Sequence, residues 1–231
     1  MTRLLAWLVH LYTALGLVCA AVIAVLIVRG DAASFRLAFA WMMVATLIDA
    51  TDGWLARLAR VKQVLPQFDG SALDNVIDFH TYVSLPLLLL WRAGTLPGPL
   101  AWLLLLPLLA SGYGFSQVNA KTSDGFFLGF PSYWNIVALY LYVLRAPVAV
   151  AVGLIVLLSG LTFVPTRYLY ASRGGPFARV VNLGAAVYFV VLALVLADAG
   201  GHSRTWALVS LAYPLLYLGL SAAVSARHRR A

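Results

Sequence analysis

The chain has 231 residues, of which 63% are hydrophobic and only 10% are charged, and its mean hydropathy is +0.92. Soluble domains typically carry about 25% charged residues, so the composition excludes an ordinary soluble protein and indicates an integral membrane protein. The basic residues that give the net charge of +8 lie between apolar runs, which favours an anionic lipid surface as the partner and argues against nucleic acid.

Eight apolar segments are predicted to form membrane-spanning helices, because a helix needs about 20 apolar residues to cross a bilayer. They lie near residues 7–28, 35–59, 72–91, 97–118, 131–144, 148–170, 177–196 and 205–225. The fifth segment is short because Arg145, Ala146 and Pro147 interrupt it, so it either extends into the preceding FFLGF or does not cross fully. We therefore expect an all-α polytopic membrane bundle of about eight transmembrane helices that forms one domain over residues 1–231.

The basic residues predict the orientation of these helices. With eight spans, both termini share one side with the loops after the second, fourth and sixth segments. That side holds most of the 16 Lys and Arg residues. Because Lys and Arg concentrate on the cytoplasmic side of membrane proteins, we expect the N- and C-termini to be cytoplasmic.

The second and third predicted helices carry most of the acidic residues. All eight acidic residues are aspartates, and five of them lie between residues 49 and 78. Asp49 and Asp52 are three apart, whereas Asp74 and Asp78 are four apart, so each pair shares one face of its helix. Because a short polar connector makes the two helices antiparallel neighbours, the four carboxylates are predicted to meet at one depth.

Four carboxylates held close together repel unless they are protonated or neutralised by a multivalent cation. Oxygen ligands suit Mg²⁺, Mn²⁺ or Ca²⁺, and four carboxylates suffice for two ions, an arrangement used in phosphoryl transfer. Structural salt bridges are the weaker interpretation, because aspartates within spans are costly and usually functional. Asp69, beside Gly70 in the connector, is instead predicted to form a turn or a helix cap.

The spacing D-x2-D-G-x2-A-R, followed by a spacer and G-x3-D-x3-D, resembles the signature of the CDP-alcohol phosphotransferase family. The pattern stands at Asp49, Asp52, Gly53, Ala56, Arg57, Gly70, Asp74 and Asp78. The spacer, residues 58–69, is longer than is usual in the family. This length and the stretches VLPQFDGSALDNVIDFHTYVSLP and KTSDGFFLGFPSYWN resemble the bacterial phosphatidylcholine synthase branch.

The resemblance implies transfer of the phosphatidyl group from CDP-diacylglycerol to choline, which gives phosphatidylcholine and CMP. It implies two divalent ions, Mn²⁺ or Mg²⁺, and Asp78 as the catalytic base. The implied metal ligands are Asp49, Asp52, Asp74 and Asp78, and the implied CDP-binding residues are Thr13, Asp52, Gly53, Ala56, Arg57 and Gly70. It also implies a multi-pass protein of the bacterial inner membrane with a cytoplasmic active site, and dimerisation is usual in the family.

The acceptor site is expected to contain aromatic rings, because choline carries a fixed cation that aromatic faces recognise. Candidates on the cytoplasmic side are Tyr82, Tyr133 and Trp134, although each alone is also typical of an interfacial aromatic belt. Arg167 and Arg173 either bind lipid phosphate or are ordinary cytoplasmic basic residues. His10 stands where the family often has an asparagine, and we interpret it as a packing residue.

Other functions share parts of this pattern. Within the family, phosphatidylserine or phosphatidylglycerol-phosphate synthesis is the first alternative. Aspartate-rich membrane prenyltransferases also use metal and pyrophosphate, but their acidic motifs lack the G-x2-A-R element. An ion transporter would spread its acidic residues across the bilayer, whereas here they cluster at one edge.

Overall fold

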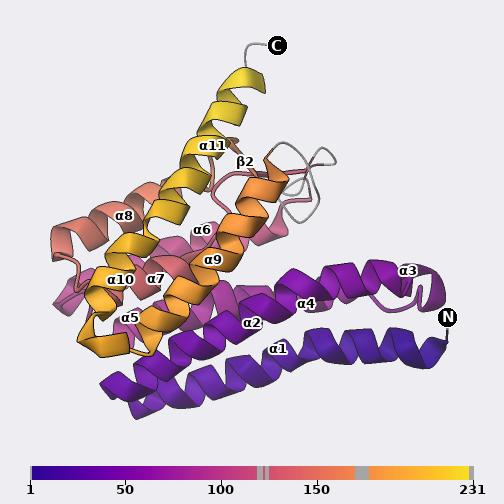
Figure 1. Ribbon diagram of the computed structural model, residues 1–231, viewed down its shortest axis with the longest axis horizontal. Helices are drawn as coiled ribbons and strands as arrows, with labels where there is room; N and C mark the ends of the chain where they lie inside the picture. Colours follow the sequence, from indigo (N-terminus) through magenta and orange to yellow (C-terminus); the bar gives the residue numbers. More distant parts are fainter. Residues whose placement is uncertain (1, 119–121, 123–124, 170–176, 229–231) are drawn as a thin grey trace.

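The computed structural model describes residues 2–118, 122, 125–169 and 177–228, and this part of the chain is almost entirely helical (Figure 1). Within it, five helices are long and apolar enough to cross a membrane. They are Arg3–Arg29, Ala32–Leu58, Gly98–Ser116, Ala178–Leu196 and Ser203–Ala226. The predicted all-α polytopic membrane fold is thereby confirmed, while the count of eight spans stays a prediction.

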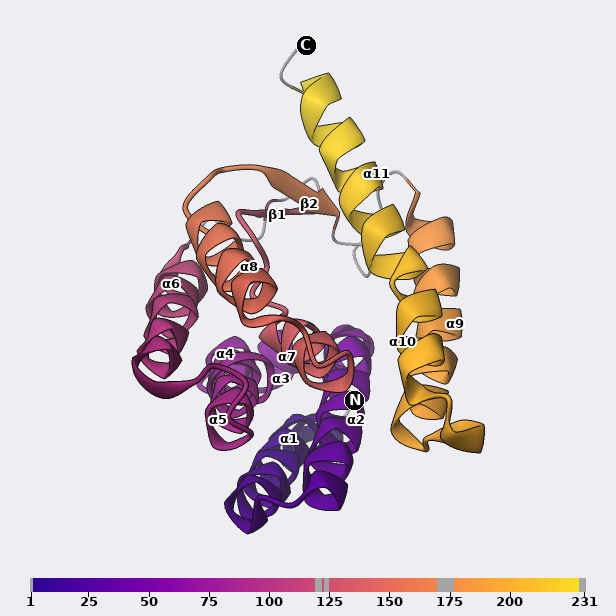
Figure 2. The same cartoon turned by 90° about the vertical axis from the view of Figure 1, so that its left-hand side faces the viewer.

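The first two helices, α1 (Arg3–Arg29) and α2 (Ala32–Leu58), lie side by side over their whole length (Figures 1 and 2). Gly30 ends α1 in the left-handed conformation, with φ of 75°, which glycine adopts without a steric penalty. Asp31 caps α2 by accepting a hydrogen bond from the Ser34 N–H at 2.9 Å. This tight capped turn makes the two helices antiparallel.

The connector after α2 folds back against α1. Arg60 turns the chain in the left-handed conformation, with φ of 46°, and the short helix α3 (Val61–Val64) follows. The connector is anchored by a small apolar cluster from α1 and the connector itself, made of Ala6, Val9, Ala59, Val61 and Leu65. The extra length of this spacer therefore forms a packed element at the end of α2.

The third predicted span is an unbroken helical segment with a π-helical middle. It comprises α4 (Gly70–Asp78), the π-helix η1 (Phe79–Ser84) and α5 (Leu85–Arg92). The side chain of Asp69 accepts hydrogen bonds from two N–H groups in the first turn of α4, at 2.9 and 3.1 Å, so its predicted capping role is confirmed. Pro86 lacks the N–H that a regular helix would direct to the Tyr82 carbonyl, which favours the wider π turn just before it.

Eight further helical elements follow in the described chain. They are η2 (Gly98–Leu104) with α6 (Leu105–Ser116), α7 (Trp134–Val143), α8 (Val148–Leu161), α9 (Ala178–Leu196), the short η4 (Ala199–Gly201), and α10 (Ser203–Ser210) with α11 (Ala212–His228). The fifth predicted span is short, as expected: ten residues of α7 measure about 15 Å, half of a bilayer core.

The prediction of a helix over residues 148–170 is wrong beyond Leu161. There the chain leaves the helix, and Arg167–Leu169 form strand β2, which pairs antiparallel with β1 (Phe126–Leu128). Pro165, which cannot continue a helix ladder, lies between α8 and β2. Sequence reasoning anticipated no strand in this chain.

The outer edge of β2 is bonded to α11, which runs beside it (Figure 1). Tyr217 donates its hydroxyl to the Leu169 carbonyl at 3.0 Å, and Ser221 accepts the Leu169 N–H at 3.2 Å. Ser225, one turn further on, accepts the Arg167 N–H at 3.3 Å. Side chains four residues apart on one helix face thus satisfy backbone groups that a free strand edge would leave exposed.

The core and the outer surface have the polarity expected of a membrane protein. The main apolar core includes Ile23, Phe39 and Ile155, which are 2% exposed or less. Large apolar side chains also cover much of the outside, such as Val28 and Leu183. So extensive an apolar surface indicates that lipid covers it.

Candidate active site

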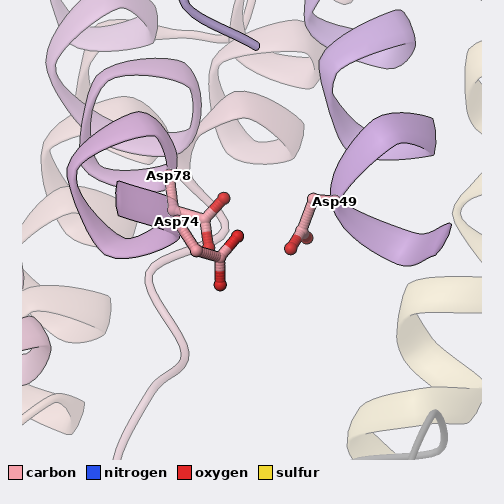
Figure 3. Close-up of side chains that lie close together, drawn as sticks. All are labelled: Asp49, Asp74 and Asp78. Carbon is pink, nitrogen blue, oxygen red and sulfur yellow. The ribbon is translucent and has the colours of Figure 1, made fainter. Parts of the chain in front are cut away.

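Three of the predicted carboxylates meet between α2 and α4. Asp49 of α2 points toward Asp74 and Asp78 of α4 (Figure 3), and one oxygen of each lies within 4.8 Å of the other two. These residues form the carboxylate triad, in which Asp78 is buried and the other two are partly buried. Because three negative charges this close repel and oxygen donors suit hard cations, the triad could hold a metal ion such as Mg²⁺ or Mn²⁺.

Asp52, the fourth predicted ligand, lies outside this triad. It is buried one turn further along α2, and its Oδ2 accepts a hydrogen bond of 2.8 Å from Thr13 Oγ1. Thr13, expected to contact CDP, is itself buried and directs its hydroxyl at this carboxylate. The structure therefore assigns α1 a part in the site, because its Thr13 fixes the orientation of a carboxylate on α2.

Asp49 receives a similar hydrogen bond from the π-helical segment. The hydroxyl of Tyr82 donates to Asp49 Oδ2 at 2.8 Å, and the tyrosine is only 8% exposed. The Leu85 N–H bonds to the carbonyl of His80, five residues back, which is the π-helical pattern. Each of the two carboxylates on α2 thus accepts a hydrogen bond from a hydroxyl group of a neighbouring segment. The hydrogen bond to Asp49 also places Tyr82 against the triad.

Four of the six residues expected around CDP, Asp52, Gly53, Ala56 and Arg57, lie toward the end of α2 that the predicted topology makes cytoplasmic. At Gly53 an added Cβ would meet only the Arg57 guanidinium, 3.4 Å away, so this helix face is open. Ala56 is partly buried against the apolar cluster of the connector. Arg57 is exposed at the end of the helix, where its charge can reach a ligand. This face can accommodate a flat group beside a cation.

Gly70 has a different reason to be glycine. A Cβ added there would lie 2.6 Å from Cε1 of His10, so no side chain fits between α1 and α4 at this point. His10 is 6% exposed and its ring lies 4.4 Å from that of Phe68, between ring centroids, in agreement with a packing role. Its Nε2 has no hydrogen-bond partner among the described residues.

Trp134 lies in the core of the protein, and this burial argues against the predicted contact with choline. Its side chain has 0% exposed surface, its ring N–H donates to Ser111 Oγ at 3.0 Å, and Phe130 packs against it. A fully buried ring offers no face to a ligand. Sequence reasoning could not distinguish it from Tyr133, its partly buried neighbour, because both follow the same proline-containing turn.

Tyr133 contacts a residue that sequence reasoning missed. Its ring centroid lies 6.2 Å from that of Tyr82 and 6.4 Å from that of Tyr217 on α11. No sequence signal singles out Tyr217, since it lies in an apolar run that predicts a plain membrane span. The structure thus joins the last helix to the predicted site.

Of the two arginines predicted near lipid phosphate, Arg167 lies on β2, with its guanidinium carbon 5.5 Å from the centre of the Phe126 ring. This contact packs the cation on the small sheet and leaves it partly exposed. Arg173 lies outside the described residues.

The chain is similar along most of its length to bacterial proteins named phosphatidylcholine synthase. It is 37% identical over 229 residues to the one from Legionella pneumophila, with 94% of this chain and 87% of the relative covered. The one from Pseudomonas aeruginosa is 38% identical over 188 residues, covering 81% and 76%. The one from Rhizobium johnstonii is 35% identical over 189 residues, covering 80% and 77%. No family model matches the chain.

Proposed function

The chain belongs to the phosphatidylcholine synthase family, and from this membership we propose that it transfers the phosphatidyl group of CDP-diacylglycerol to choline, yielding phosphatidylcholine and CMP. The observation that carries the proposed chemistry is the carboxylate triad, set between two neighbouring helices of a membrane protein. A site of this kind suits a reaction in which one substrate is a lipid and the others are polar.

Asp49, Asp74 and Asp78 would hold a divalent ion, Mn²⁺ or Mg²⁺, and Asp52 would be a ligand of a second ion close by. The donor set supports this proposal, because the triad offers only carboxylate oxygens from two helices. When bound, the metal supplies positive charge that offsets the charge of the pyrophosphate and of the leaving nucleotide. Thr13 and Tyr82 keep two of the carboxylates oriented through their hydroxyl groups.

Asp78 would act as the general base. Its carboxylate takes the proton of the choline hydroxyl while the choline oxygen forms a bond to the phosphorus that carries the diacylglycerol oxygen. The bond from this phosphorus to the CMP oxygen breaks, and CMP leaves with the electron pair. Asp78 is 9% exposed, so few water molecules compete with the alcohol beside it.

The nucleotide would lie on the open face of α2. Gly53 and Ala56 let a flat group approach that helix, Arg57 binds a phosphate, and Gly70 lies opposite at the start of α4. The acyl chains enter from the bilayer, while choline and CMP exchange with the cytoplasm. In this proposal the site lies at the cytoplasmic face of the bacterial inner membrane, with both termini on that side.

The test is an alcohol-dependence assay with the purified protein in liposomes that contain CDP-diacylglycerol. Choline, serine, inositol and glycerol phosphate are supplied singly, and CMP release and lipid product are measured. We expect choline alone to drive turnover, EDTA to abolish it, and Mn²⁺ or Mg²⁺ to restore it. Turnover with another alcohol in preference to choline, or full turnover in EDTA, would overturn the proposal.

A further inference from the structure

Three tyrosines from distant parts of the chain form a row that begins at the carboxylate triad. Tyr82 of η1 bonds Asp49 through its hydroxyl, its ring contacts that of Tyr133, and Tyr133 in turn contacts Tyr217 of α11. The planes of the first two rings are inclined by 50°, and those of the second two by 66°. The rings of this tyrosine row are therefore inclined to one another and not stacked in parallel.

Exposure separates the members of the row. Tyr82 is buried and its hydroxyl is engaged by a carboxylate, whereas Tyr133 and Tyr217 are only partly buried. We propose that Tyr133 and Tyr217 bind the trimethylammonium group of choline and that Tyr82 is a positioning residue for Asp49. This inference rests on the proposed function, because it takes choline as the acceptor.

The chemistry of the ligand agrees with this division. A quaternary ammonium has no N–H to donate, so aromatic faces within about 6 Å attract it better than hydrogen-bond acceptors do. Only two carbons separate the hydroxyl of choline from its nitrogen. A choline whose hydroxyl lies at Asp78 therefore keeps its cation close to the triad, and Tyr133, which contacts Tyr82, is the nearer of the two proposed rings.

The small sheet holds the outer ring in place. Tyr217 donates its hydroxyl to the Leu169 carbonyl at 3.0 Å, and Ser221 on the next turn of α11 accepts the N–H of the same residue. On the other side, Ser132 adopts the left-handed conformation, with φ of 56°, and turns the chain just before Tyr133. Both rings are thus positioned by backbone contacts before any ligand binds, which lowers the entropic cost of binding.

The first test compares leucine variants of the two outer rings. Tyr133→Leu and Tyr217→Leu are expected to raise the KM for choline about tenfold each, the effect of losing one cation–π contact. The KM for CDP-diacylglycerol stays within about twofold. Tyr217→Phe keeps the ring and removes only the hydroxyl, which bonds the Leu169 carbonyl and also contacts Tyr133 and Ser221, so its choline KM rises less than that of Tyr217→Leu.

Tyr213→Leu is the matched control. Tyr213 lies one turn earlier on α11, is also partly buried, contacts another tyrosine, and donates its hydroxyl to a backbone carbonyl, that of Val181. It differs from Tyr217 in lying outside the row. Its leucine variant is expected to leave the choline KM unchanged, which separates loss of a ligand contact from loss of a tyrosine on α11.

Tetramethylammonium provides a readout independent of turnover, since it has the cation of choline without the hydroxyl. We expect it to compete with choline and to raise the thermal unfolding midpoint of the wild-type protein. In Tyr217→Leu, the concentrations of tetramethylammonium needed for both effects should be about tenfold higher. If Tyr217→Leu does not fold, the same two measurements on Tyr133→Leu test the proposal, because this variant leaves the contacts between β2 and α11 intact.

The inference is overturned if folded leucine variants keep the wild-type choline KM and the wild-type response to tetramethylammonium. That outcome differs from failure of the proposed function, which would appear as a wild-type protein that does not use choline. The inference is also contradicted if Tyr217→Leu and Tyr213→Leu raise the choline KM equally, because an equal rise indicates a general structural effect.

Discussion

The two halves of the candidate active site are built in different ways. The carboxylate half comes from α2 and α4, two helices that are close in sequence and joined by a capped connector. The aromatic half takes Tyr82, Tyr133 and Tyr217 from three distant segments, and a two-stranded sheet fixes the last of them. The comparison suggests that the reaction chemistry and the recognition of the acceptor can be altered separately by mutation.

The largest expected effect is on the carboxylate half. Asp78→Asn should lower the turnover number about 10³-fold, because the amide cannot accept the proton of the alcohol. Metal binding, measured from the Mn²⁺ concentration that raises the thermal unfolding midpoint, should stay largely intact, since Asp49 and Asp74 remain. Asp69→Asn is the control: this exposed residue caps α4, and asparagine caps equally well, so turnover should be unchanged. Near-native turnover of Asp78→Asn would show that another group removes the proton.

Tyr82 lies where the two halves meet, so its phenylalanine variant sharpens the comparison. Tyr82→Phe keeps the ring and removes the hydroxyl that bonds Asp49. The Mn²⁺ concentration for half-maximal activity should rise about tenfold, as is typical when a partner of a metal ligand is lost, while the choline KM stays the same. A rise of the choline KM alone would instead place Tyr82 in the acceptor site.

Tyr140→Phe is the control for this measurement. The Tyr140 hydroxyl on α7 is within hydrogen-bonding distance of the hydroxyls of Tyr188 and Ser210, and none of these residues belongs to the triad or to the tyrosine row. Its loss should therefore leave the Mn²⁺ dependence at the wild-type value.

The contrast between the halves also explains how much could be predicted from sequence. Spacings of three and four residues fix a helix face locally, so the approach of Asp49 to Asp74 and Asp78 followed from the chain itself. Asp52 shares that face in sequence, yet the structure places it against Thr13 of α1, a contact that depends on how two helices pack. Spacing alone does not encode that packing.

The aromatic half was largely out of reach of sequence reasoning. Trp134 and Tyr133 are adjacent in sequence, but one is fully buried and the other partly exposed, because the turn at Ser132 sets which ring faces the core. The strand pairing of β1 and β2 depends on contacts between residues far apart in the chain. Tyr217 is held in part by its bond to the Leu169 carbonyl of that sheet, a contact that a hydropathy pattern cannot show.

Replacing two glycines of the carboxylate half by alanine should have different effects: one replacement lowers stability and the other weakens substrate binding. Gly70→Ala forces a Cβ to within 2.6 Å of the buried His10 ring, and such overpacking costs about 1–3 kcal/mol. The thermal unfolding midpoint in detergent should fall by several degrees and recover in part in the double variant with His10→Ala. Gly53→Ala meets only a flexible guanidinium, so the fold should hold while the KM for CDP-diacylglycerol rises. Equal loss of stability in both variants would contradict this distinction.

The smallest effect is expected at an ion pair that lies outside the candidate active site and links the loop after α9 to α2. Asp198, between α9 and α10, forms an ion pair of 3.0 Å with Arg36 near the start of α2. Both side chains are about 40% exposed, so this pair contributes little, and Asp198→Asn should lower the thermal unfolding midpoint at pH 7 by less than about 3 °C.

The pH dependence of this small loss identifies its cause. A hydrogen bond from the Ser203 hydroxyl, more than the charge of Arg36, holds the pKa of Asp198 below its usual value of 3.8. A lowered pKa in the folded state stabilises the protein above the unfolded-state pKa, and this stabilisation is lost as pH falls through the folded-state value. The difference between wild type and Asp198→Asn should therefore be constant from pH 5 to 8 and shrink below about pH 4. We expect Ser203→Ala, which retains the ion pair, to abolish this pH dependence, and Arg36→Gln to preserve it. The opposite result would show that the ion pair with Arg36 lowers the pKa of Asp198 more than the Ser203 hydroxyl does.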